Sequence, residues 1–177
     1  LLAGPPDSGK ARFAAALGAY LLCRSHGKPC GECRQCKLVA AGTHPDLLEV
    51  TLEDSKQIRI EQIRELIHWA TQTSQQGGYK VCNINPADKL NIQSANALLK
   101  VLEEPPPDTL ICLVSDQPTR LLPTLRSRCQ RIGLGSPSRQ EAVVWLRGQM
   151  DSSTDVELLL GIADGMPLRA LNSIDKD

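Results

Sequence analysis

A glycine-containing loop near the start of the chain has the residue pattern of a phosphate-binding loop. Residues 4–11 read Gly-Pro-Pro-Asp-Ser-Gly-Lys-Ala and match G-x-x-x-x-G-K between a strand-like and a helix-like segment. Gly4 and Gly9 would let backbone N–H groups face the phosphates. Lys10 would reach the β- and γ-phosphates, beside the positive end of the following helix. The alternative is a glycine turn before an ordinary helix, and the motif alone leaves it open.

Two parts of the machinery for ATP hydrolysis are missing around this loop. The residue after the loop lysine should be Ser or Thr to hold Mg²⁺, and it is Ala11. An acidic pair should end a later strand, but the candidate strand runs into Asn85-Pro86, and Asp88 lies beyond it. We therefore expect weak nucleotide binding or none, and no useful hydrolysis at this site.

Four of the seven cysteines form a second chemical cluster. The spacing C-x6-C-x2-C-x2-C is made by Cys23, Cys30, Cys33 and Cys36. Four thiolates suit the tetrahedral coordination of a structural Zn²⁺, and Gly27 and Gly31 would let the chain fold tightly around the ion. The alternatives are an iron–sulfur cluster and four unrelated free cysteines. A closed four-thiolate site leaves no position for a substrate, so we expect a role in folding.

The composition argues against several other classes of protein. The chain balances 20 basic with 20 acidic residues, so it has no global attraction for DNA, and its 3% aromatic content disfavours a row of base-stacking side chains. No apolar run is long enough to cross a membrane, and no secretory signal peptide is visible. An odd number of cysteines argues against a disulfide framework. We expect a cytoplasmic protein in a reducing compartment.

Alternating strand-like and helix-like segments must position these residues. Strand patterns are expected at 1–3, 47–52, 80–85, 110–115 and 129–134. Helical patterns are expected at 11–22, 60–70, 91–102 and 118–126. Strands that alternate with helices indicate a parallel sheet with helices on both faces.

The pattern changes after Pro137, where only helical segments follow. Ser138 and Glu141 have the spacing of a capping box at the start of the first of these helices. We therefore expect an α/β P-loop domain over 1–136, which contains the cysteine insert at 23–36, and a small all-α domain over 137–177.

Both ends of the chain look cut. The chain opens without Met on Leu1-Leu2-Ala3, which reads as a strand already under way. Its last residues, 174–177, do not resemble a natural domain end. We therefore expect a fragment that lacks its true N-terminus.

Three segments together resemble the AAA+ subunits of bacterial clamp loaders and, among these, the delta-prime family of DNA polymerase III. They are the cysteine insert followed by Gly-Thr-His-Pro-Asp at 42–46, the run Asn-Ala-Leu-Leu-Lys-Val-Leu-Glu-Glu-Pro-Pro at 96–106, and Leu-Arg-Ser-Arg-Cys at 125–129. The related ATP-hydrolysing gamma/tau family would keep Thr after the loop lysine and the acidic pair. The resemblance implies a P-loop AAA+ fold with a zinc insert, followed by a helical lid domain.

The resemblance also implies roles for single residues. Arg128, in the Ser-Arg-Cys motif, would act in trans as an arginine finger on ATP held by a neighbouring gamma/tau subunit. Without that motif, an Arg near a helix end would more simply be a solvated charge. Arg169 matches the sensor-2 position of the lid, and Ser115 matches the polar sensor-1 position at a strand end. In active members of the family both positions serve the bound nucleotide; beside this degenerate loop, a purely structural role is the alternative for each.

Taken as a whole, the resemblance implies a non-hydrolysing stator of the clamp-loader pentamer. Its partners would be gamma/tau and delta subunits and, through the complex, the sliding clamp and primed DNA. A helical collar domain would complete the missing C-terminal part. The holoenzyme is a DNA-directed DNA polymerase, a nucleotidyltransferase, but nothing in this chain resembles the paired metal-binding carboxylates of a polymerase site.

Three other functions remain open at this point. The first is an active ATPase of the gamma/tau type, which would need the magnesium ligand and acidic pair that the sequence lacks. The second is a zinc-stabilised interaction module with no role at any nucleotide site. The third is a protein that binds DNA directly, which the zero net charge disfavours.

Overall fold

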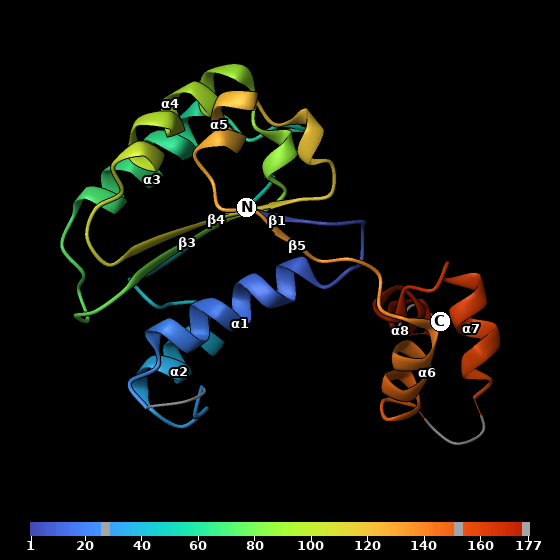
Figure 1. Cartoon of the computed structure of the whole chain (residues 1–177). Coiled ribbons are helices and arrows are strands. Elements are labelled where there is room, and N and C mark those ends of the chain that lie inside the picture. Colours follow the sequence, from blue (N-terminus) through green and yellow to red (C-terminus); the bar gives the residue numbers. More distant parts are fainter. Residues whose placement is uncertain (26–28, 151–153, 175–177) are drawn as a thin grey trace.

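A parallel β-sheet lies at the centre of the computed structural model, which describes residues 1–25, 29–150 and 154–174 (Figure 1). The strand order is β2-β3-β4-β1-β5, and every pairing is parallel. The strands are β1 (Leu2–Ala3), β2 (Leu47–Val50), β3 (Lys80–Ile84), β4 (Thr109–Ser115) and β5 (Ile132–Gly133). The predicted α/β fold with a parallel sheet is confirmed.

Helices cover both faces of the sheet, as Figure 1 shows. One face carries α3 (Ile60–Thr71), α4 (Ile92–Glu103) and α5 (Pro123–Ser127), and the other carries α1 (Lys10–Leu22) and α2 (Arg34–Ala40). The small residues of α1 let it lie close to the sheet, because a Cβ added at Gly18 would already be 3.4 Å from a methyl group of Val81.

The main core lies between the sheet and the layer formed by α3, α4 and α5. It is aliphatic, as a chain with few aromatic residues requires, and its fully buried side chains include Ile63, Leu66, Ile84, Leu98 and Leu125. Leu125 fixes α5 against this core. The short helix that carries the Ser-Arg-Cys motif is therefore held firmly, although the polar residues around Leu125 face outward.

Three helices follow the sheet and form a separate cluster, the lid helices of the predicted lid domain. They are α6 (Arg139–Arg147), α7 (Val156–Ile162) and α8 (Pro167–Ile174), packed around Ala142, Leu146, Val156, Leu160, Ala163 and Ala170. The predicted capping box is confirmed, since Ser138 accepts from the backbone N–H of Glu141 and donates its own N–H to the Glu141 carboxylate. The domain boundary after residue 136 stays a prediction, and the predicted chain end at 175–177 lies outside the described residues. In the described part of the chain, no helix has both the length and the apolar character needed to cross a membrane.

The structure differs from the sequence-based expectations in three segments. Helix α2, which begins inside the cysteine insert and ends beyond it, was not expected. The helical pattern over 118–126 is divided into a short 3₁₀ helix, η2 (Pro118–Arg120), and α5, because Pro123 has a fixed φ and no N–H and therefore begins a new helix. The strand expected at 129–134 pairs as a regular strand only at Ile132–Gly133.

Candidate functional site

The glycine loop connects β1 to α1 and lies against the chain that follows β5. Gly9 directly precedes α1 with a φ of 86°, a left-handed conformation that glycine adopts without steric cost. Gly4 lies so close to the next segment that an added Cβ would collide with the carbonyl oxygen of Leu134. Both glycines therefore have a structural reason to be present, and their role in nucleotide binding stays a prediction.

Lys10 is the first residue of α1, and its ammonium group is fully engaged within the chain. The side chain is only 4% exposed. Its Nζ donates to the carbonyl oxygen of Pro5 at 2.6 Å and to Oγ of Ser8 at 3.2 Å, and it forms an ion pair with Oδ1 of Asp116 at 2.6 Å. Because a lysine ammonium has three hydrogens, these partners account for all of its donors. A bound phosphate would have to displace at least one of them.

Asp116 directly follows β4 and is held in place by a neighbouring carboxylate. Ser115, the polar residue predicted at a strand end, is the last residue of β4 and is buried. Its Oγ donates to Oδ1 of Asp88 at 2.9 Å, and the same oxygen accepts from the backbone N–H of Asp116 at 3.2 Å. Asp88 does lie beyond the end of β3, in η1 (Ala87–Lys89), but its carboxylate reaches back to fix the turn that carries Asp116.

The two positions where an ATPase would bind Mg²⁺ carry an alanine and an amide. Ala11 and Asn85 line a hollow of about 250 Å³ together with Lys10 and Asp116. Ala11 has no ligand atom, and Asn85 presents an uncharged side chain where a carboxylate is needed. The two carboxylates that line this hollow are already paired, Asp116 with Lys10 and Asp7 with Arg169. The arrangement lacks the ligand set for a hydrolytic magnesium ion.

Arg169 lies in the first turn of α8 and joins the lid helices to the glycine loop. Its Nε donates to Oδ2 of Asp7 at 3.0 Å, and another guanidinium nitrogen donates to Oδ2 of Asp164 at 2.8 Å. The hydrogen bond to Asp7 is the main reason why the pKa of the Arg169 guanidinium is raised above its ordinary value. The predicted sensor-2 residue is thus beside the glycine loop, but its charge is shared between two carboxylates.

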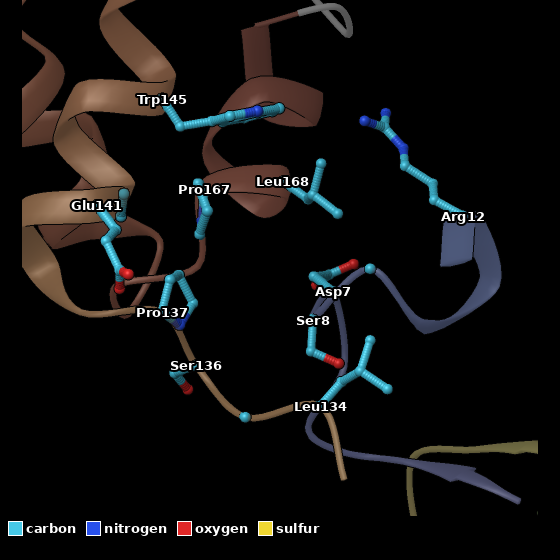
Figure 2. Close-up of a pocket in the computed structure, with 13 residues that line it drawn as sticks. Asp7, Ser8, Arg12, Leu134, Ser136, Pro137, Glu141, Trp145, Pro167 and Leu168 are labelled. Atoms are coloured by element: carbon cyan, nitrogen blue, oxygen red, sulfur yellow. The ribbon is translucent and has the colours of Figure 1, made fainter. Parts of the chain in front are cut away.

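A cavity of about 680 Å³ opens between the glycine loop and the lid helices (Figure 2). Trp145 of α6 and Leu168 of α8 form an apolar wall, and Arg12 of α1 projects from the opposite side. Asp7 and Ser8 form the end of the cavity nearest the sheet. The space beside the loop is therefore open. Lys10 and Arg169 are paired within the chain, whereas Arg12 is an exposed cation at the wall of the cavity.

Arg128, the predicted arginine finger, lies at the end of α5 and is paired within the chain. Its Nε donates to Oε1 of Glu103 at 2.6 Å, and another guanidinium nitrogen donates to the carbonyl oxygen of Thr124 at 3.0 Å. The side chain is one-third exposed, and Glu103 is nearly half exposed. The simple alternative of a solvated charge is therefore incomplete, because the guanidinium is anchored at the surface. Its role in trans stays a prediction.

The four predicted metal ligands come together on one side of α1. Their sulfur atoms all lie within 4.8 Å of one another, and Sγ of Cys30 is 3.8 Å from Cys23 and 3.9 Å from Cys36. Four sulfurs in a tetrahedron at about 2.3 Å from a metal ion are about 3.8 Å apart. The cluster therefore fits a four-thiolate metal centre, with Cys33 as its fourth ligand.

Hydrogen bonds to the sulfur atoms favour the thiolate form of part of this cluster. A hydrogen bond from Ser25, supported by the backbone N–H of Cys33 at 3.3 Å, lowers the pKa of Cys30 to about 6. Burial acts in the opposite direction and raises the pKa of Cys36 to about 11. A divalent cation at the centre would remove this conflict, because its charge stabilises every thiolate that it binds.

Local backbone structure explains how these cysteines are positioned. Cys33 is the N-cap of α2, and its sulfur accepts from the backbone N–H of Cys36, so the helix begins at a metal ligand. Gly31 has a φ of 76°, which supports its predicted role in the tight turn. Gly27, predicted to have a similar role, lies outside the described residues.

A buried aspartate, the last residue of the Gly-Thr-His-Pro-Asp segment at 42–46, ties the cysteine insert to the sheet, a role that sequence reasoning did not assign to it. Asp46 is 1% exposed, and its carboxylate accepts from Oγ of Ser74 and from the backbone N–H groups of Gln75 and Gln76, each at 2.8 Å. Gln76 in turn accepts a hydrogen bond from Gln35 of α2 at 3.3 Å. The loop that Asp46 orders therefore supports the insert.

Sequence reasoning also missed the pairing partners Asp7 and Asp116, which neutralise Arg169 of α8 and Lys10 of the glycine loop, respectively. Each carried a usable signal. Asp7 is an acidic residue inside a loop pattern that normally faces phosphates, and Asp116 directly follows a buried strand beside the predicted sensor-1 serine. The sequence did not show which cation each of them would meet.

Comparison with known proteins identifies similar sequences over most of the chain. The family described as DNA polymerase III, delta subunit, matches residues 1–138. A Pseudomonas aeruginosa protein named DNA polymerase III subunit delta' is 44% identical over 175 residues, which cover 96% of this chain and 53% of that protein. The Escherichia coli protein of the same name is 40% identical over 175 residues, with coverage of 97% and 52%. The chain spans about half the length of the curated relatives it matches.

A solved structure supports the fold independently. The crystal structure of a DNA polymerase III gamma subunit-related protein from Thermotoga maritima matches with a TM-score of 0.57 and 20% identity, over 96% of this chain and 64% of that one. At this identity the likeness shows the fold alone. Together with the parallel sheet and the cysteine cluster, it confirms the predicted fold class.

Proposed function

The chain belongs to the DNA polymerase III delta subunit family, and from this membership we propose that it is a delta-prime-type clamp-loader subunit that does not hydrolyse ATP itself. It acts as a stator beside gamma/tau and delta subunits, whose ATP-driven motions load the sliding clamp on primed DNA. Its contribution to the chemistry is Arg128, which serves ATP bound to a neighbouring gamma/tau subunit.

One observation carries the non-hydrolysing part of this proposal. The positions of the two magnesium ligands are occupied by Ala11 and Asn85, in the same hollow as the loop lysine. Without Mg²⁺, the charge that develops on the phosphoryl oxygens during transfer is not neutralised. Lys10, the remaining cation of the loop, is already bound to Asp116.

The placement of Arg128 supports a role at a neighbour's phosphate. Leu125 anchors α5 in the core, while Arg128 lies at the surface at the end of that helix. Its pairing with Glu103 joins two partly exposed side chains, and such pairs contribute only about 0–1 kcal/mol. The guanidinium can therefore exchange Glu103 for a phosphate, which offers more negative charge and can accept from two guanidinium N–H groups at once.

The cysteine cluster contributes to the same assembly by stabilising the fold of the segment between α1 and α2. Zn²⁺ is the metal that best suits four thiolates in a tetrahedron, and a closed site of this kind stabilises the fold without taking part in catalysis. We assign Cys23, Cys30, Cys33 and Cys36 as its ligands.

The proposed function is tested by the ATPase rate of a reconstituted loader that contains full-length protein, stimulated by clamp and primed DNA. Because an arginine finger contributes about 10³- to 10⁵-fold at the site it serves, we expect Arg128→Ala to lower turnover by at least about tenfold while the complex still assembles. The matched control is Arg126→Ala, which removes an exposed arginine of the same helix. An equal effect of both variants, or no effect of Arg128→Ala, would reduce the chain to a scaffold.

The full-length protein without its partners tests the rival function, that of an active ATPase. The full-length protein alone should show no Mg²⁺-dependent turnover. Turnover that Lys10→Ala abolishes would assign hydrolysis to this chain and overturn the proposal.

A further inference from the structure

The two cations that would bind the phosphates of a nucleotide are each paired with a carboxylate of the same chain. Lys10 is paired with Asp116 at 2.6 Å, and Arg169 is paired with Asp7 at 3.0 Å. The two carboxylates come from different elements, since Asp7 lies within the glycine loop and Asp116 follows β4. Asp7, Lys10 and Asp116 line the hollow beside the loop, where a phosphate chain would enter, and Arg169 is joined to it through its pair with Asp7.

We propose that Asp7 and Asp116 occupy the phosphate positions of this loop from within and thereby exclude phosphate-bearing ligands. This inference rests on the proposed non-hydrolysing function and goes further. The missing magnesium ligands explain why the chain would not hydrolyse ATP. They do not explain why it would not bind a nucleotide, because the glycines, Lys10 and Arg169 are all present.

The chemistry of a carboxylate suits this role. Like a phosphoryl group, it offers negatively charged oxygens that accept strong hydrogen bonds from ammonium and guanidinium groups. A carboxylate fixed in the chain needs no binding from solution, so it competes at a high effective concentration. A phosphate-bearing ligand would have to break both ion pairs and would then leave two carboxylates facing its own negative charge.

The same contacts hold the lid helices on the loop without any ligand. The pair of Asp7 and Arg169 joins residues that are 162 positions apart, and Asp164 binds the same guanidinium from the segment before α8. A side-chain atom added at Gly9 would touch Leu168, so α8 also packs directly on the loop. In a nucleotide-driven subunit, ligand contacts would make this connection. Here the chain makes it with its own residues and without a ligand, as the proposed stator role requires.

The test compares anion binding by full-length wild-type protein and the double variant Asp7→Asn/Asp116→Asn. Asn is chosen because Asp7 has a φ of 60°, a conformation that Asn tolerates well, so the loop keeps its shape while the charge is removed. The probes are pyrophosphate and ADP, titrated without Mg²⁺ and followed by calorimetry. Fluorescence of Trp145, which lines the cavity, gives a second signal for ADP.

We expect little or no binding to the wild-type protein at millimolar probe. The double variant should bind pyrophosphate about tenfold to a hundredfold more tightly than the wild type does. This is the usual effect of one hydrogen bond to a charged group. Lys10→Ala on the double-variant background should abolish the gain. The matched control is Asp164→Asn, which removes the other carboxylate on Arg169 without clearing the position that Asp7 fills. It should leave pyrophosphate binding within about twofold of the wild type, because its pair is largely exposed.

Zinc content and thermal melting establish that each variant is folded. A folded double variant that binds no more tightly than the wild type would overturn the inference, as would tight pyrophosphate binding by the wild type. Neither result bears on the finger, which depends on Arg128 and is measured by the loader's ATPase. If Arg128→Ala left that ATPase unchanged while the double variant gained anion binding, the proposed function would fail and this inference would stand.

Discussion

The guanidinium of Arg128 and the carboxylate of Glu103 form a hydrogen-bonded ion pair between the ends of two helices, with Nε 2.6 Å from Oε1. Arg128 follows α5 and Glu103 ends α4. Both residues belong to the segments that carry the family resemblance, so a residue of one segment holds a residue of the other. In the isolated chain, the proposed arginine finger is therefore bound to a carboxylate of its own subunit.

The pair predicts that Glu103→Gln and Arg128→Ala have different effects on loader turnover. Glu103→Gln removes the competing charge, so Arg128 should reach a neighbour's phosphate at lower cost, and loader turnover should equal or exceed that of the wild type. Because the pair is partly exposed, the free energy of unfolding should change by less than about 1 kcal/mol. Loader ATPase and urea unfolding of the isolated protein measure the two effects.

The neighbouring Glu104, also exposed, provides the control as Glu104→Gln. It should leave turnover unchanged. If Glu103→Gln instead lowered turnover as strongly as Arg128→Ala, Glu103 would be positioning the guanidinium for catalysis and could not be described as its competitor.

The metal centre predicts that the loss of one of its four thiolates lowers both the zinc content and the thermal stability of the protein. In Cys33→Ser, the new hydroxyl can still cap α2, because Ser is a good N-cap residue, but the fourth thiolate is lost. We expect about one zinc ion per chain in the wild type, much less in the variant, and a melting temperature several degrees lower, because metal binding is coupled to folding. Elemental analysis and thermal melting measure both.

Cys129→Ala is the matched control, because Cys129 lies outside the cluster and is half buried. It should keep its zinc. A chelator should remove the difference in melting temperature between wild type and Cys33→Ser. A wild-type protein that melts at the same temperature with and without metal would contradict a structural role for the cluster.

The contacts of Asp46 predict a large loss of stability on its substitution, although the sequence assigned this residue no role of its own. Its buried carboxylate accepts three hydrogen bonds from the loop at 74–76. Asp46→Asn keeps the shape but replaces one acceptor oxygen by a donor and removes the charge, so we expect a loss of about 2–4 kcal/mol in the free energy of unfolding. The exposed Asp54→Asn should change it by less than about 0.5 kcal/mol. Urea unfolding compares the two, and similar losses would show that the hydrogen bonds are not the cause.

Local patterns predicted much of the fold because each rests on neighbouring residues. The glycine loop, the cysteine spacing and the alternation of strands and helices all involve short stretches of chain. The capping box of Ser138 and Glu141 is another example, since its partners are three positions apart. These features depend on backbone geometry that the residues themselves impose.

The decisive features of the glycine loop could not be predicted in this way. Lys10 and Asp116 are far apart in the sequence, and their pairing depends on how β1 and β4 lie beside each other in the sheet. The contact between Asp7 and Arg169 depends on how the lid helices pack. Periodicity gives the faces of helices and strands, but it does not show which charges meet when distant elements pack together.

The capping box of α6 predicts a pH dependence of stability. Hydrogen bonds from the hydroxyl and backbone N–H of Ser138 lower the pKa of Glu141 below its ordinary value. An acid with a lowered folded pKa contributes stability above its unfolded pKa and loses it as the pH falls through the folded value. The stability difference between wild type and Glu141→Gln should therefore be present at pH 7 and shrink below about pH 4. Thermal melting of both proteins at each pH measures this difference, and a constant difference would contradict the prediction.

Two glycine-to-alanine substitutions should have opposite effects, for reasons that lie in the surroundings of each residue. At Gly4, a Cβ would collide with the carbonyl oxygen of Leu134, whose own N–H pairs with Ala3 at 2.8 Å, so neither backbone segment can move without breaking the sheet. Gly4→Ala should therefore lower the free energy of unfolding by at least about 2 kcal/mol. At Gly161, within α7, a Cβ meets only open space, and alanine should raise it by up to about 1 kcal/mol because it favours the helix. Urea unfolding measures both. Equal effects of the two substitutions would mean that the close approach of Leu134 is not the reason for a glycine at the start of the loop, and the phosphate-binding role of Gly4 would become the better explanation.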